Sequence, residues 1–372
     1  DLHRVDRRQR QMCIRDSGNT VTLFMVGSVV LAAALVGLVD PIVRLISTPE
    51  EAVAGTAAYL TICFIGIPCI TAYNVLASIF RGMGDSRSPM YFIAAACVVN
   101  IGLDFFFMGA LRLGPAGAAL GTTLSQAVSV LLAFCVILKR KSIRLSKSDF
   151  CPRKATMKDI LSIGLPVAAQ DGFIQVSFML ITIMANQRGL TDAAAVGIVE
   201  KIISFLFLVP SSMLSTVSAL GAQNIGAGKY DRVDKILRYA IAIGVGFGAV
   251  MALLMQFIAP SMVRPFTSDE AVVLAGAAYI RSYIFDCLFA GIQFSFSGYF
   301  CAWGRSGLSF LHNTLSILLV RVPGAWLACR FFPQTLVPMG LAPACGSLFS
   351  SIVCVLLYRW MKRQNKPTGD KD

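Results

Sequence analysis

The chain has few of the residues that enzyme sites and soluble domains need. Only 14% of its 372 residues are charged and two are histidines, so a metal cluster built from histidines is excluded. The eleven cysteines are scattered, mostly within apolar runs and without a CxxC pair, which indicates free buried thiols. There is no nucleophile elbow, phosphate-binding loop or catalytic triad. The sequence therefore predicts no enzyme and no bound cofactor.

Apolar sequence, in contrast, is abundant. The chain is 56% hydrophobic, whereas soluble domains average about 45–50% even when glycine is counted. A helix that crosses a membrane needs about 20 predominantly apolar residues. The pattern predicts an all-α integral membrane protein with ten spanning helices, at residues 20–46, 52–80, 88–110, 115–138, 159–186, 193–219, 236–263, 271–300, 307–331 and 338–361.

The longest polar run separates four of these helices from the other six. Residues 139–158 contain eight Lys or Arg against one acid, Asp149, which is typical of a cytoplasmic loop between membrane helices. A nucleic-acid-binding arm is the alternative, and the apolar composition argues against it. The expected organisation is a leader, an N-lobe of four helices, a basic cytoplasmic linker, a C-lobe of six helices and a cytoplasmic tail, at 1–17, 18–138, 139–158, 159–363 and 364–372.

The basic residues also predict the orientation of the helices. With the linker placed in the cytoplasm, 25 of the 33 Lys and Arg residues lie on the cytoplasmic side and five on the opposite side. The remaining three, Lys201, Arg281 and Arg321, lie within helices. This asymmetry favours a multi-pass plasma-membrane protein whose linker and C-terminus are cytoplasmic.

Residues 1–17 differ from the pattern that follows. They are basic, begin with Asp and contain no apolar core of a signal peptide. We interpret them as a foreign or misassembled leader. A native cytoplasmic loop is the alternative.

The two lobes repeat each other at an offset of 220 residues. Eight identities occur over the 39 aligned positions 48–86, and both copies begin their helix on the same side, which predicts parallel repeats. The same register leaves two helices without a counterpart before residue 1, so a complete chain is expected to have 6 + 6 helices. The first-copy residues that recur are Glu50, Val53, Ala57, Ala58, Tyr59, Phe80, Gly84 and Ser86.

A parallel 6 + 6 repeat with a basic central loop resembles the multidrug and toxin extrusion (MATE) family. The resemblance covers residues 19 to about 363, and no single motif decides it. Its residues are Phe80-Arg-Gly-Met-Gly-Asp-Ser86, Asn100-Ile-Gly-Leu-Asp104, Gly114-Pro-Ala-Gly-Ala-Ala-Leu-Gly-Thr122, Ile163-Gly-Leu-Pro166 and Gly221-Ala-Gln-Asn-Ile-Gly-Ala-Gly228.

The resemblance implies a monomeric exporter of drugs or organic, often cationic, metabolites that works by alternating access between two lobes. Inward flow of Na⁺ or H⁺ would drive export, and the bilayer rather than nucleic acid would be its partner. Two alternatives are a flippase for lipid-linked saccharides, which needs a more cationic cavity, and an inactive fragment, because two helices are missing.

Three residues of the N-lobe form the first candidate site. Asn100 and Asp104 are four apart and share a helix face, and Thr122 is expected at a similar depth on the next helix. Their oxygens suit a small cation such as Na⁺, and the carboxylate can instead bind a proton. These positions match the family's first-lobe cation site. An interhelical hydrogen bond that only holds the lobe together is the structural alternative.

The C-lobe departs from part of the family. Some members carry essential acids on the helix after the linker and on the tenth helix, where this sequence has Gln175 and Ala290. Asp171 and Asp286 lie one turn away and are candidate substitutes, and with Gln175 they form the possible coupling set of the C-lobe. Glu200 and Lys201 are expected near a helix start at the interface, and Arg321 is expected to bind carbonyls freed by Pro323.

Overall fold

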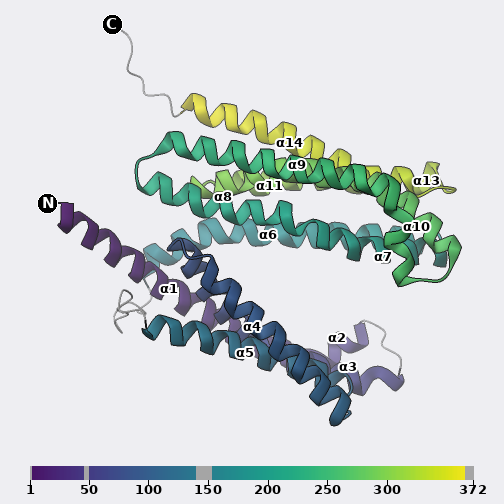
Figure 1. Ribbon diagram of the computed structural model, residues 1–372, viewed down its shortest axis with the longest axis horizontal. Coiled ribbons are helices and arrows are strands. Elements are labelled where there is room, and N and C mark those ends of the chain that lie inside the picture. The colour runs from purple at the N-terminus through teal and green to yellow at the C-terminus, as the bar shows by residue number, and fades with distance from the viewer. Residues whose placement is uncertain (1, 46–49, 140–152, 365–372) are drawn as a thin grey trace, which may run out of the picture. The chain divides into compact units, whose positions relative to one another are not determined.

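The computed structural model describes residues 2–45, 50–139 and 153–364, and in these ranges it contains helices and no strand. The chain divides into two compact units, residues 1–160 and 161–372, each built of long helices (Figure 1). Among the described residues, ten helical segments are long and apolar enough to cross a membrane, four in the first unit and six in the second when Lys154–Asn186 is counted with the latter. The predicted all-α membrane fold with 4 + 6 spanning helices is confirmed.

Unit 1 packs around α3. This helix contacts α1 and α5, and α5 also contacts α4. Tyr73, Ala77 and Phe80 recur at helical spacing on α3 and bury themselves against Phe92 and Ala133, so one apolar stripe joins α3 to both α4 and α5. The elements of unit 1 are α1 (Leu2–Gly37), α2 (Val39–Leu45), α3 (Glu50–Gly82), α4 (Arg87–Asp104), the π-helix η1 (Phe105–Ala110) and α5 (Pro115–Lys139).

Unit 2 packs around α11, which contacts α8, α9 and α14. Gly244 and Gly248 let α9 pack closely against α11. A Cβ at Gly248 would lie only 2.6 Å from the Cα of Leu288 on α11. The elements of unit 2 are α6 (Lys154–Asn186), α7 (Leu190–Leu206), α8 (Leu208–Gly226), α9 (Tyr230–Val263), η3 (Arg264–Phe266), α10 (Glu270–Tyr283), α11 (Phe285–Ala302), α12 (Ser306–Ser316), the π-helix η4 (Ile317–Arg321), α13 (Val322–Phe331) and α14 (Val337–Gln364).

In unit 2, three of the predicted spans are interrupted. The span expected at 193–219 breaks at Phe207, three residues before Pro210, and the span at 271–300 breaks at Ile284. The span at 307–331 contains the wide turn η4 immediately before Pro323. Proline removes a backbone donor and crowds the preceding turn, which accounts for the first and third interruptions.

The internal repeat recurs in the backbone. At the end of α3, Asp85 N–H donates to the carbonyl of Phe80 (2.9 Å) and Gly84 has φ +85°. At the end of α11, Arg305 N–H donates to the carbonyl of Phe300 (2.8 Å) and Gly304 has φ +68°. Both are the same helix-ending turn, which requires a left-handed residue.

The proposed leader and linker are only partly described. Helix α1 begins at Leu2 and runs through residues 2–17 without a break. Helix α5 ends at Lys139 and α6 begins at Lys154, so most of the predicted linker and the tail after Gln364 lie outside the described residues.

Candidate functional site

The site of unit 1 lies where α4 meets α5. Asp104 is the last residue of α4 and is followed by the wide turn of η1. Asn100 lies one helical turn earlier, and its amide Nδ2 donates a long hydrogen bond of 3.5 Å to Asp104 Oδ1. Both side chains are partly buried. The expected pairing of Asn100 with Asp104 on one helix face is therefore present.

Gly121 of α5 faces this pair. A Cβ at Gly121 would collide with Asp104 Oδ1 and would lie 3.5 Å from Asn100 Nδ2. The carboxylate consequently packs directly against the backbone of α5, in space that only glycine leaves free. The contact of Gly121 with Asp104 was not predicted from the sequence.

The structure does not bring Thr122 to Asp104. Thr122 is exposed, and its hydroxyl donates to the carbonyl of Ala118 in its own helix (3.0 Å). Successive residues of a helix point about 100° apart, so the side chain of Thr122 follows a different direction from that of Gly121. Gly121, the adjacent residue, faces Asp104, whereas Thr122 lies on a different face of α5.

Asp104 has no ion-pair partner among the described residues, and the amide of Asn100 lies beside it. An ionised carboxylate six residues inside the end of the span Arg87–Ala110 is costly without a counter-charge. Such a group can accept a proton or a small hard cation. No cluster of three or more metal-ligating side chains occurs in the part of the chain that the structure describes.

In unit 2 the charged groups are organised differently. Asp286, at the start of α11, is fully buried and lies 3.6 Å from Arg321 Nη2, which is also buried. The same Nη2 donates to the hydroxyl of Tyr283 (2.8 Å), and the guanidinium lies 4.9 Å from the ring centre of Phe178. Arg321 thus pairs with an acid and an aromatic hydroxyl, and the expectation that it binds carbonyls freed by Pro323 was wrong.

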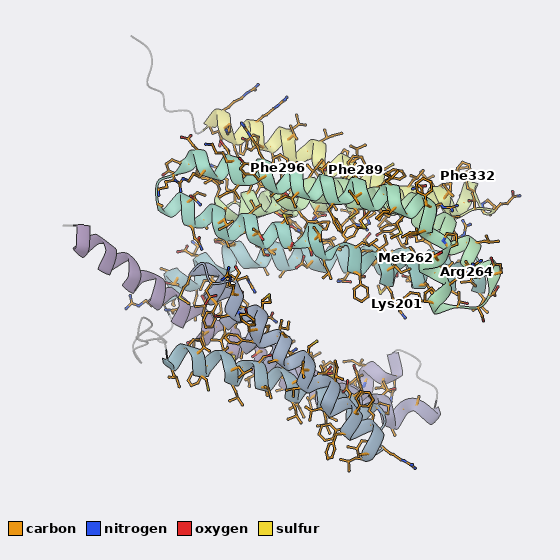
Figure 2. All side chains as sticks on the ribbon, viewed as in Figure 1. Lys201, Met262, Arg264, Phe289, Phe296 and Phe332 are labelled. Carbon is orange, nitrogen blue, oxygen red and sulfur yellow. The ribbon has the colours of Figure 1, made fainter. Side chains whose placement is uncertain are left out.

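The predicted C-lobe set is not brought together. Asp171 and Gln175 lie on exposed positions of α6, whereas Asp286 is enclosed between helices. Glu200 is the eleventh residue of α7 and accepts a hydrogen bond from Thr182, so its expected place at a helix start was wrong. Lys201 is exposed and points away from the helices of unit 2 (Figure 2).

Hydrogen bonds between buried polar side chains connect α11 to α12 and to α14. His312 Nε2 lies 3.0 Å from Ser297 Oγ, and its Nδ1 lies 2.7 Å from Ser350 Oγ. Gln293 Nε2 donates to Ser347 Oγ at 3.1 Å. The sequence offered little signal for this network, because isolated Ser and His residues in apolar helices have no distinctive spacing.

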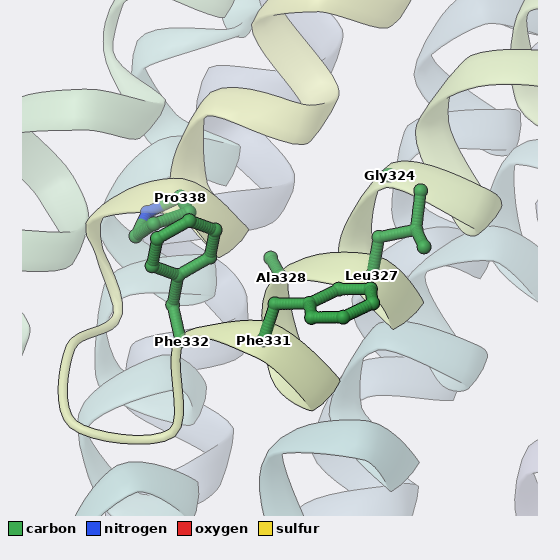
Figure 3. A pocket seen from close by; sticks show the side chains of 6 residues that line it. All are labelled: Gly324, Leu327, Ala328, Phe331, Phe332 and Pro338. Atoms are coloured by element: carbon green, nitrogen blue, oxygen red, sulfur yellow. The ribbon is translucent and has the colours of Figure 1, made fainter.

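An apolar groove of about 570 Å³ lies at the end of α13. It is formed by side chains of α13, the following turn and the start of α14, and it contains no titratable group (Figure 3). The rings of Phe331 and Phe332 flank it. It offers apolar contact without a polar group that would select a ligand.

These observations define a polytopic membrane protein of two helical units with acids inside the spans. The family model MatE matches residues 8–106 and 166–327. The "Probable multidrug resistance protein YpnP" of Bacillus subtilis is 30% identical, over 92% of this chain and 76% of the relative, and the "Probable multidrug resistance protein NorM" of Thermotoga maritima is 23% identical, over 93% and 76%.

Solved structures agree on the fold. The crystal structure of the Vibrio cholerae MATE transporter VcmN matches with a TM-score of 0.89 at 18% identity, covering 96% of this chain and 82% of that one. The chain belongs to the MATE family of multidrug efflux transporters.

Proposed function

We propose that this protein is a cation-coupled antiporter that exports drugs or organic metabolites across the cell membrane. The observation that carries the proposal is the carboxylate of Asp104, which lies inside a membrane span with an amide beside it and without a counter-charge among the described residues. Na⁺ or H⁺ is the coupling ion, and Asn100 and Asp104 bind it. Membership of a multidrug efflux family and the names of the relatives as multidrug resistance proteins support organic compounds as the exported class.

The proposed orientation places the linker and the C-terminus in the cytoplasm, following the excess of Lys and Arg on that side. A flippase for anionic lipid-linked saccharides is less well supported. Such a transporter needs unpaired cations facing its substrate, whereas the buried cation Arg321 is already paired with Asp286.

The test is dye efflux in vesicles on which a Na⁺ or a H⁺ gradient is imposed separately. Asp104→Asn is expected to abolish efflux driven by either gradient, because the site loses its charge. Gly121→Ala is expected to reduce it strongly, because the added methyl group displaces the carboxylate. Thr122→Ala serves as the matched control and should leave efflux intact. Normal efflux by Asp104→Asn, at equal membrane abundance, would overturn the assignment of the site.

A further inference from the structure

Helix α14, which lies along one edge of unit 2 (Figure 1), carries a continuous stripe of exposed side chains on its latter part. The members of this stripe recur at intervals of four, four, three and four residues, so they share one face of the helix. Three of them are aliphatic and the last two are arginines, so the stripe changes from apolar to positively charged towards the end of the helix. The stripe consists of Leu348, Ile352, Leu356, Arg359 and Arg363, all exposed.

The opposite face of the same turns is held against the other helices. Met361 is two residues from each arginine of the stripe and therefore lies about 200° away around the helix, and it is buried. Lys362 Nζ donates to Asp234 Oδ2 on α9, so an acid compensates its charge. The two arginines of the stripe consequently point outward, whereas the lysine between them is already paired.

A third arginine reaches the end of α14 from the turn between α11 and α12. Arg305 Nη1 donates to Gln364 Oε1 (3.4 Å), and its guanidinium lies 5.8 Å from the ring centre of Trp360. Trp360 is exposed, and tryptophan is enriched at the level of lipid headgroups. We call Arg305, Arg359 and Arg363 the arginine cluster, and none of its members has an ion-pair partner among the described residues.

The aliphatic part of the stripe has the length of one membrane leaflet. Leu348 and Arg359 are eleven residues apart, which corresponds to about 16 Å along a helix. Half of a hydrocarbon core of about 30 Å is about 15 Å. Because α14 is one of the membrane spans, arginines at headgroup level leave the aliphatic side chains beside the acyl chains of a single leaflet.

We propose that this face of α14 binds an anionic phospholipid of the membrane, with its phosphate on the arginine cluster and its acyl chains along the aliphatic part of the stripe. Arginine presents several N–H donors to phosphate oxygens, and clusters of basic residues at the end of a span attract anionic lipids. A free phosphate ion would leave the aliphatic side chains uncovered. A zwitterionic lipid would bring a cation of its own to three arginines. The site is distinct from Asn100–Asp104 and does not depend on the proposed transport activity.

The experiment is native mass spectrometry of the purified chain, delipidated in detergent and titrated with dioleoyl phosphatidylglycerol. We expect one saturable lipid per chain. Arg359→Gln and Arg363→Gln should each weaken its binding about fivefold, and the double variant about 25-fold, from the usual contribution of a basic residue at a membrane surface. Dioleoyl phosphatidylcholine should bind the wild type at least about tenfold more weakly, because it has no net negative charge.

Arg232→Gln is the matched control for the arginine variants. Arg232 is exposed on α9, whose Asp234 contacts Lys362, so the variant removes the same charge from the same end of unit 2. Arg232 is two residues from Asp234 and therefore points away from α14. Its replacement should leave the binding of phosphatidylglycerol unchanged. An equal loss in Arg232→Gln and Arg359→Gln would overturn the proposal, because it would show a general attraction of charge without a local site.

Two further measurements separate a lipid site from a site for a soluble anion. Inorganic phosphate should not displace bound phosphatidylglycerol, and Leu356→Ser should weaken lipid binding although it changes no charge. Displacement by inorganic phosphate, or equal binding of phosphatidylglycerol and phosphatidylcholine by the wild type, would overturn the proposal. The comparison of the two lipids uses the wild type alone, so it decides the matter even if a variant does not fold, as judged by gel filtration.

Discussion

The two units place repeated sequence in very different surroundings. In the most apolar stretch of Ala52–Gly82, 6% of the residues are buried, whereas in Glu270–Ala302, its counterpart 220 residues later, 61% are buried. Helix α11 is surrounded by α8, α9 and α14, and α3 is covered mainly by α1 and α5. The same helix with the same final turn is thus enclosed in unit 2 and largely exposed in unit 1, because its neighbours decide its burial.

The difference in burial is accompanied by a difference in polar chemistry. The enclosed helix α11 carries Asp286, Gln293 and Ser297, each with a partner on another helix. In unit 1 the side chain of Asp104 is partly exposed and accepts a hydrogen bond from an amide of its own helix. Enclosed polar groups must be satisfied by fixed partners, and a group that exchanges an ion must remain accessible.

The largest effect is expected from breaking the buried pair of unit 2. Asp286→Asn or Arg321→Gln alone should each lower the free energy of unfolding by about 3–5 kcal/mol, because each leaves a charge without its partner. The double variant should lose clearly less than the sum of the two. Chemical unfolding in detergent measures this cycle, and strictly additive losses would show that the two side chains do not interact.

The exposed ion pair of the same unit is the control for that cycle. Arg264 and Glu270 lie 3.2 Å apart with 61% and 63% of their side chains exposed. Solvent screens such a pair, so Arg264→Gln or Glu270→Gln should cost less than about 1 kcal/mol. A cost as large as that of the buried pair would contradict the role given to burial.

Close helix packing gives the next largest effect. Gly248→Ala should destabilise unit 2 by about 1–3 kcal/mol, because its methyl group would press on the backbone of Leu288. Gly246→Ala, two residues away on α9, adds a methyl group with nothing within 4 Å and should be neutral or slightly stabilising. Thermal unfolding of the two variants checks the difference, and equal midpoints would be inconsistent with the close contact of α9 and α11.

The number of spans and the helix-ending turns could be predicted because they are local properties of the sequence. Runs of about 20 apolar residues mark membrane helices, and Gly84 and Gly304 mark where two of them end. The face that Thr122 presents could not be predicted, because an error of one residue in a helix start turns every side chain by about 100°. The pairing of Asp286 with Arg321 was equally inaccessible, since the two residues lie on different helices and no periodicity connects them.

The smallest loss of stability is expected from changes in the helix-ending turn that both units share. Gly84 and Gly304 have φ of +85° and +68°, and a Cβ at either would have nothing within 4 Å. Conformational strain is then the only cost of alanine, so Gly84→Ala and Gly304→Ala should each destabilise the protein by about 1–2 kcal/mol. Gly84→Asn should cost less than Gly84→Ala, since asparagine tolerates the left-handed region. Gly82→Ala lies in the helical last turn of α3, where an added Cβ would meet nothing within 4 Å, and should not destabilise the protein. Calorimetry of the four variants decides the matter, because a large inequality between Gly84→Ala and Gly304→Ala would mean that the surroundings of the turn, and not its backbone, set its stability.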